Sequence, residues 1–175
     1  PMTQAFAGVR IVDFTQVLAG PFAIQQLALL GAEVIKIEQP DRGDQTRDLM
    51  NHGQRHGPGM SPSFMSCNIG KRSITLNLKA PQARDIVTAL VKRADVVAEN
   101  FRPGVMDRLG FGDESLRKIN PSIIYCSISG YGQIGPKSGI PAYDGAIQAD
   151  SGMMATNGHP QTGPTRTGYM PVDMS

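Results

Sequence analysis

Hydrophobic residues in this chain recur in short runs whose spacing alternates between that of strands and that of helices. Runs of β-branched residues and strict alternation predict strands over residues 9–14, 33–38, 73–78, 95–99 and 122–128. Apolar residues at helical spacing predict helices over 22–30, 81–94, 105–109 and 114–119, and a last one within 143–155. The ends of these helices carry suitable residues: Pro21 and Pro81 in first turns, Gly31 and Gly110 after last turns, and Asp113 as an N-cap.

Strands and helices that alternate in this way are typical of an α/β domain built on a mostly parallel sheet, with helices on both faces. The first strand, helix and strand form a βαβ unit, whose crossover is expected to be right-handed. Residues 40–70 show no periodicity and are predicted to be a long surface connection. A Gly/Pro loop over 129–141 and a polar loop over 157–171 come later, and residues 172–175 add no closing element. We therefore expect an interrupted domain.

The composition is that of one soluble globular domain, with 175 residues of which 40% are hydrophobic and 18% charged. The 17 Lys and Arg nearly balance the 15 Asp and Glu, so the charge predicts neither a nucleic-acid partner nor an anionic membrane surface. No run approaches the roughly 18 apolar residues of a membrane span, and the first residues do not resemble a signal peptide. Cys67 and Cys126 lack metal-ligand spacing, so we expect reduced thiols, no metal and a cytoplasmic location.

Three loops are candidates for ligand binding, because ligands of open α/β sheets bind beyond the carboxyl ends of the strands. Residues 15–21 form a turn that opens a helix, which is either an anion site or an ordinary βα turn. Residues 71–72 are two adjacent cations, either a phosphate site or a solvated pair. After the fourth strand, Phe101 suits stacking on a base, and Arg102 and Arg108 suit binding of phosphates. In a parallel sheet we expect the three loops to converge on one edge.

Residues 130–135 form a literal GxGxxG, Gly-Tyr-Gly-Gln-Ile-Gly. A dinucleotide-binding fingerprint needs a helix directly after the glycines, but prolines follow here, so a flexible Gly-rich active-site flap is the preferred interpretation. An NAD-dependent oxidoreductase stays an alternative. Farther along, Asp144, Asp150 and Asp173 each suit a helix cap or a carboxylate nucleophile, and spacing does not choose between them. His159 lies in a polar loop and is interpreted as a surface residue.

Several segments also follow one another in a familiar order: GVRIVDF at 8–14, VLAGP at 17–21, LGAEVIKIE at 30–38, KRSI at 71–74, ADVV at 94–97, ENFRPG at 99–104, DRLG at 107–110 and SGYGQ at 129–133. In this order the sequence resembles the N-terminal part of class III (family III) CoA-transferases. That group includes formyl-CoA, carnitine-CoA and bile-acid-CoA transferases, with α-methylacyl-CoA racemase as a relative. The resemblance extends over nearly the whole chain.

The resemblance implies a large Rossmann-like domain plus a smaller one, in two subunits interlocked like chain links. Residues 1–175 would be the N-terminal portion of the large CoA-binding domain, with the small domain absent from this chain. Coenzyme A is then substrate and product, the other partners are an acyl-CoA and a small carboxylic acid, and no metal is implied. The implied CoA contacts are Gln16, Val17, Leu18, Ala19, Lys71, Arg72, Asn100, Phe101, Arg102 and Arg108. The implied active-site loop carries Gly130, Tyr131, Gly132 and Tyr143.

The catalytic Asp of such enzymes follows a Pro/Gly-rich loop and a short apolar run, a place that Asp173 takes here. By resemblance, Asp173 attacks the thioester to give an acyl–aspartyl anhydride and then an aspartyl-CoA thioester. A racemase is the runner-up, but it would need His where this chain has Tyr143, and a phenol with a pKa of about 10 is a poor acid–base partner. Formyl-type relatives carry a basic residue in place of Gln39, for which Arg42 is a substitute. A non-catalytic fragment that binds CoA, or only a partner chain, is a third interpretation.

Overall fold

The computed structural model describes residues 4–49 and 59–174. Its strands are β1 (Arg10–Asp13), β2 (Glu33–Glu38), β3 (Arg72–Thr75), β4 (Val96–Glu99) and β5 (Ile124–Ser127). Its helices are α1 (Ala19–Leu29), α2 (Pro62–Asn68), α3 (Pro81–Val91), α4 (Val105–Leu109), α5 (Asp113–Ile119), α6 (Asp144–Asp150) and α7 (Met153–Thr156), with 3₁₀ turns η1 (Gln45–Arg47) and η2 (Val172–Met174). The predicted strands are all confirmed, with ends that shift by a few residues.

β1 lies at the centre of a five-stranded sheet of order β3-β2-β1-β4-β5, in which every neighbouring pair is parallel. This order confirms the predicted α/β, Rossmann-like class. The chain first builds outward from β1 to β3 and then returns to place β4 on the other side of β1. The strand order therefore reverses between β1 and β4, and ligands of open parallel sheets bind beyond the carboxyl ends at such a reversal.

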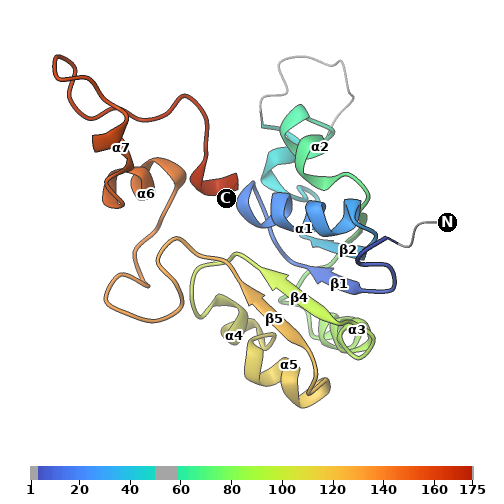
Figure 1. Ribbon diagram of the computed structural model, residues 1–175. Helices are drawn as coiled ribbons and strands as arrows, with labels where there is room; N and C mark the ends of the chain where they lie inside the picture. The colour runs from blue at the N-terminus through green and yellow to red at the C-terminus, as the bar shows by residue number, and fades with distance from the viewer. Residues whose placement is uncertain (1–3, 50–58, 175) are drawn as a thin grey trace. The chain divides into compact units, whose positions relative to one another are not determined.

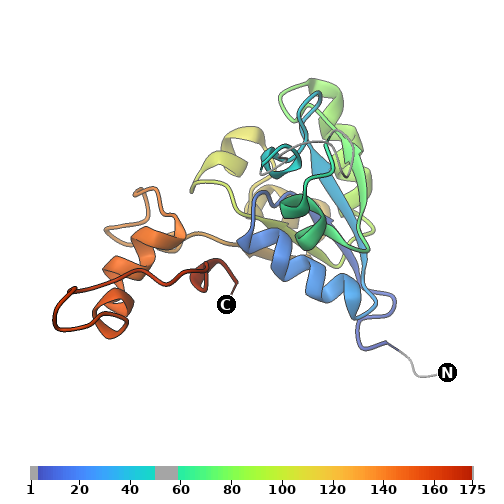
Figure 2. The same ribbon diagram turned by 90° about the horizontal axis from the view of Figure 1, so that it is seen from above.

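Different helices cover the two faces of the sheet, as predicted (Figures 1 and 2). Because side chains alternate along a strand, Ile11 and Val12 of β1 enter opposite faces. The face toward α1 holds a small core cluster of Ile11, Ile24, Ala32, Val34 and Ala98. The face toward α3, α4 and α5 holds the larger cluster, which includes Val12, Phe14, Val87, Val97, Met106 and Leu116. The α1 face has fewer apolar residues, and this leaves room there for polar ones.

The connection over residues 40–70 is only partly irregular, which corrects the prediction. α2 lies within it: Pro62 opens the helix, and the side chain of Ser61 caps it by accepting the N–H of Phe64 at 3.1 Å. The buried face of α2 carries the polar Asn68 beside Phe64 and Cys67, so the pattern of apolar residues did not mark it as a helix. Residues 50–58 of this connection lie outside the described residues.

Two smaller expectations are also corrected. The N-cap of α5 is Gly112, and Asp113 lies within the first turn, where its carboxylate pairs with Arg117 at 2.7 Å. α3 ends at Val91, before its predicted end at 94, and the side chain of Ile86 on this helix is exposed.

The chain divides into two compact units, residues 1–128 and residues 129–175. The first unit holds the whole sheet, and the second holds α6, α7 and η2. None of the helices in the described ranges combines the length and the apolar character that crossing a membrane requires.

Candidate active site

Asn100 fastens the loop after β4 to the loop after β1, at the point where the strand order reverses. Its Oδ1 accepts the backbone N–H of Gln16 at 2.7 Å, and its Nδ2 donates to the backbone carbonyl of Gln16 at 2.7 Å. Both backbone polar groups of Gln16 are thereby engaged. The loops over 15–18 and 100–104 therefore lie together, which confirms that these two candidates meet at one edge of the sheet.

Val17 holds a backbone conformation that β-branched residues rarely adopt, with φ at +71°. Its N–H faces the carboxylate of Asp44, with both oxygens at 3.3 Å. At the start of α1, a Cβ added to Gly20 would lie 2.5 Å from the side chain of Thr15, so only glycine lets the helix approach this closely. The loop over 15–18 is thus held in one strained conformation, as segments at binding sites often are.

Four buried ions lie behind this loop. Lys71 Nζ pairs with Asp13 at 2.9 Å, and Lys36 Nζ pairs with Asp44 at 3.0 Å, with all four side chains at most 2% exposed. Lys36 also donates to the carbonyl of Thr15 at 2.6 Å. Burial lowers the pKa of Lys71, while Asp13 acts in the opposite direction. Because removal of one partner would leave an uncompensated buried charge, this network resists rearrangement and fixes the loop above it.

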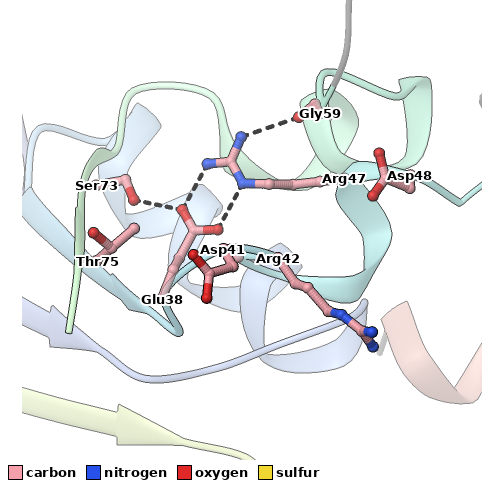
Figure 3. Close-up of a pocket in the computed structure, with 9 residues that line it drawn as sticks. Glu38, Asp41, Arg42, Arg47, Asp48, Gly59, Ser73 and Thr75 are labelled. Carbon is pink, nitrogen blue, oxygen red and sulfur yellow. Dashed lines mark hydrogen bonds and ion pairs between the residues drawn. The ribbon is translucent and has the colours of Figure 1, made fainter. Parts of the chain in front are cut away.

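A pocket of about 410 Å³ opens at the carboxyl ends of β2 and β3 (Figure 3). Glu38 lines it and accepts hydrogen bonds from Arg47 at 2.6 and 2.7 Å, from the Ser73 hydroxyl, and from the N–H of Asp44 at 2.8 Å. Burial by itself would raise the pKa of Glu38, but these donors outweigh it and hold the pKa at about 2. The guanidinium of Arg47 also lies 3.8 Å from the ring centroid of Phe64. These contacts occupy the guanidinium of Arg47, so its role is structural.

The cations that remain available at this edge are Arg42, Arg102 and Arg108, which are all exposed. Within residues 4–49 and 59–174, none of the three pairs with a carboxylate. Arg42 lines the pocket, and Figure 3 shows its side chain extending away from Glu38. Exposed guanidinium groups of this kind suit phosphate oxygens. Phe101 is half-buried and packs on the larger core cluster.

The third candidate loop does not join the other two, because residues that precede a parallel strand lie at its amino end. Arg72 is in register with Ile35, and its guanidinium pairs with Glu33 at the start of β2, 3.3 Å away. Lys71 reaches the carboxyl end of β1 only with its amino group, which Asp13 binds. The expected convergence is therefore wrong for residues 71–72. That these two residues contact CoA stays a prediction.

The Gly-rich loop over 129–141 is followed by a helix only at α6, as its prolines predicted. A Cβ added to Gly130 would lie 2.2 Å from the Cβ of Ala142, so this glycine allows close packing within the loop. The hydroxyl of Tyr131 donates to Asp150 at 2.7 Å, and Lys137 pairs with the same oxygen at 2.8 Å. Asp150 is thus an exposed anchor of the loop.

Asp144 is the buried acid of the C-terminal unit, and it holds the turn that carries Asp173. Its Oδ2 accepts the N–H of Val172 at 3.0 Å and that of Asp173 at 3.4 Å, while its Oδ1 accepts from Gln148. Burial raises the pKa of Asp173, and the negative charge of Asp144 raises it further. A half-buried carboxyl group with such a shift is typical of a functional acid. Tyr143, directly before α6, is exposed, with 77% of its surface accessible.

Sequence reasoning did not single out Asp13, Asp44 or Gln148 as site residues. The first two share a signal that was available, because each is an Asp followed two positions later by Thr. The carboxylate of Asp13 accepts the N–H of Thr15 at 2.9 Å, and that of Asp44 accepts the N–H of Thr46 at 3.0 Å. This Asp-x-Thr pattern is typical of Asx turns. No comparable local signal marks Gln148.

Two enzymes with assigned names are similar to this chain over nearly its whole length. An acetyl-CoA:oxalate CoA-transferase of Acetobacter aceti is 52% identical over 163 residues, which are 93% of this chain and 41% of the relative. A succinyl-CoA:glutarate CoA-transferase of Mus musculus is 46% identical over 168 residues, which are 96% of this chain and 38% of the relative. The chain thus spans about two fifths of the length of these relatives.

Solved structures share the fold described above. A CAIB/BAIF family protein from Brucella suis superposes with a TM-score of 0.92 at 39% identity, covering 99% of this chain and 46% of that one. A protein from Mycobacterium tuberculosis superposes with a TM-score of 0.88 at 38% identity, covering 99% of this chain and 48% of that one. Residues 6–175 match CoA-transferase family III, so the chain belongs to that family.

Proposed function

We propose that the complete protein is a CoA-transferase, which moves CoA from an acyl-CoA thioester to a carboxylic acid. The observation that carries this proposal is the match of residues 6–175 to CoA-transferase family III. The relatives named for acetyl-CoA with oxalate and for succinyl-CoA with glutarate support small acids as donor and acceptor. No feature of the described residues favours racemisation, since Tyr143 stands where that chemistry would use His.

The CoA-binding part of the proposal rests on the carboxyl edge of the sheet. Asn100 and Asp44 hold the loop over 15–18 from two sides, so its backbone is preorganised before a ligand arrives. The exposed Arg102 and Arg108 supply positive charge for phosphate groups. Formyl-type relatives carry a basic residue where this chain has Gln39, and Arg42 supplies that charge here. We assign the CoA contacts to Gln16, Val17, Leu18, Ala19, Asn100, Phe101, Arg102 and Arg108.

The chemical part of the proposal assigns Asp173 as the nucleophile. One carboxylate oxygen adds to the thioester carbonyl, the C–S bond breaks, and CoA leaves as a thiolate from an acyl–aspartyl anhydride. The thiolate then attacks the aspartyl carbonyl, which releases the donor acid and leaves an aspartyl-CoA thioester. The acceptor carboxylate then attacks the aspartyl-CoA thioester and releases the CoA thiolate from a second anhydride, between the acceptor and Asp173. The thiolate attacks the acceptor carbonyl of this anhydride, which gives the product acyl-CoA and regenerates the Asp173 carboxylate. The raised pKa of Asp173 supports this role, because a more basic carboxylate is the better nucleophile.

The anhydride must be kept from water, which would hydrolyse it. We assign this covering role to the loop that carries Gly130, Tyr131 and Gly132, together with Tyr143. The bond from Tyr131 to Asp150 is exposed, so opening the loop there breaks a contact that contributes little to stability.

The test is a transfer assay on the complete protein, with acetyl-CoA and succinyl-CoA as donors and oxalate and glutarate as acceptors. We expect Asp173→Asn to lower kcat roughly a thousandfold or more. Asp85→Asn removes an exposed carboxylate on α3, away from the residues assigned to binding and catalysis, and is the matched control, with kcat expected within about threefold of the unsubstituted protein. Hydroxylamine should trap the activated carbonyl at Asp173 only when a donor is present. If Asp173→Asn transfers CoA at the rate of the unsubstituted protein, the mechanism is wrong.

We also propose that residues 1–175 are the N-terminal portion of a large CoA-binding domain in a longer chain, which forms an interlocked dimer. Support comes from the relatives and solved structures, of which this chain covers 41% and 46%. Light scattering on the complete protein tests the assembly, and a monomer at micromolar concentration would contradict it.

A further inference from the structure

Both polar ends of the Gln148 side chain are used inside the C-terminal unit. Gln148 lies on α6 with 0% of its surface exposed. Its Nε2 donates to the carboxylate of Asp144 one turn earlier, and its Oε1 accepts the N–H of Thr167 at 3.0 Å. One buried carboxamide therefore joins the helix to a chain segment 19 residues farther along.

The turn that carries Asp173 depends on this arrangement. Gln148 occupies one oxygen of Asp144, and the other oxygen accepts the N–H groups of Val172 and Asp173. Within the described part of the chain, η2 receives no other side-chain hydrogen bond. None of its own residues is fully buried, so no side chain of η2 is anchored in a core. The orientation of the Asp144 carboxylate therefore sets the position of the turn.

We infer that Gln148 is a positioning residue for the reaction, acting through Asp144 on the backbone of Asp173. The inference rests on the proposed function, because it presumes that Asp173 is the nucleophile. A misplacement of about 1 Å at a reacting group can cost roughly a hundredfold in rate. Loss of the Gln148 contacts should therefore lower kcat far more than it raises the KM for the acyl-CoA.

A carboxamide fits this place because it donates on one side and accepts on the other. An ionised Glu has the same shape but only accepts, so Gln148→Glu would set two carboxylates against each other and free Asp144. Combining Gln148→Glu with Asp144→Asn exchanges the two groups and restores every bond. The new amide at 144 donates to the new carboxylate at 148 and accepts from Val172 and Asp173, while the carboxylate still accepts from Thr167.

The experiment compares these variants in the complete protein. We expect Gln148→Glu to lower kcat about 30- to 100-fold with KM for the acyl-CoA within about threefold, and the exchange to recover at least tenfold of that loss. The matched control is Gln161→Glu, the same change at an exposed position, expected within about twofold. A folded Gln148→Glu variant with kcat within threefold would overturn the inference, and so would a folded exchange variant without recovery.

Thermal unfolding identifies variants that do not fold. If Gln148→Glu is one of them, Gln148→Met, which is uncharged and of similar volume, replaces it with the same expected loss of kcat, and an unchanged kcat there overturns the inference. Failure of the proposed function gives a different result. In that case Asp173→Asn keeps its transfer rate and hydroxylamine traps nothing, whatever the Gln148 variants do.

Discussion

The carboxamide of Asn100 pairs with the backbone of Gln16 as a neighbouring strand would, accepting its N–H and donating to its carbonyl. The two residues are 84 positions apart, and the contact joins the ends of β1 and β4 beyond their last ladder bonds. Val17 follows at once in its strained conformation, with Asp44 on its N–H. Side chains of two other loops therefore determine the shape of this one.

Asn100→Asp should weaken CoA binding roughly tenfold or more. The new carboxylate still accepts from the N–H of Gln16, but it faces the Gln16 carbonyl without a donor, which costs about 1–3 kcal/mol. Titration calorimetry of CoA binding measures the change. The control is Asn77→Asp, because Asn77 is exposed and accepts from Lys79 through Oδ1, a bond that Asp keeps. Equal CoA affinity in the Asn100 variant would contradict the assignment of this loop.

Val17→Gly should stabilise the folded protein by about 1 kcal/mol. Strain at a positive φ destabilises the folded state by about 1–3 kcal/mol, and glycine relieves it. Glycine also makes the unfolded chain more flexible, which offsets roughly 0.5–1 kcal/mol of this gain. Urea denaturation measures the free energy of unfolding. Val17→Ala is the control, because alanine keeps the strained φ and loses only side-chain contacts. If alanine stabilises as much as glycine, the backbone at Val17 is not strained.

Glu38 should make the protein sensitive to acid. Its pKa is about 2 in the folded state against an ordinary 4.5, so its contribution is complete above pH 4.5 and is lost as the pH falls toward 2. The shift corresponds to about 3 kcal/mol at neutral pH. Glu38→Gln should remove most of this and flatten the stability curve across that window, as measured by chemical denaturation at several pH values. Glu114→Gln, on the exposed side of α5, should leave the curve as it is, and matching slopes for both variants would refute this role.

Local patterns were enough to find most elements of the fold. β2 has the predicted bounds of 33–38 because apolar and charged residues alternate from Ile35 to Glu38, and α4 has the predicted bounds of 105–109 because Gly110 ends it at φ +82°. The strand order needed contacts between distant strands, which no local pattern encodes. α2 escaped notice because its buried face includes the polar Asn68 beside Phe64 and Cys67.

The polar interior of the site was beyond local patterns for a different reason. Lys36 and Glu38 alternate with apolar neighbours, which is the pattern of a strand with one solvated face, yet both are buried. Their partners lie eight and nine positions farther along the chain: Asp44 for Lys36, and Arg47 for Glu38, both within a segment that looked like surface loop. Charge pairs of this kind exist only once the fold has brought them together.

The pH dependence of transfer should report the charge of Asp144. Burial first, and Asp144 second, raise the pKa of Asp173, so its carboxylate is protonated at a higher pH than usual and the rate falls on the acid side through that pKa. Asp144→Asn removes the repelling charge, lowers the pKa of Asp173 and moves the acid limb of kcat to lower pH. The plateau rate also falls, because Gln148 loses the oxygen to which it donates. Asp150→Asn removes a carboxylate from the far end of α6 and should leave the limb in place. Removal of a nearby negative charge can only ease ionisation of Asp173. If the acid limb of kcat stays fixed in Asp144→Asn, or moves to higher pH, the two carboxylates do not interact.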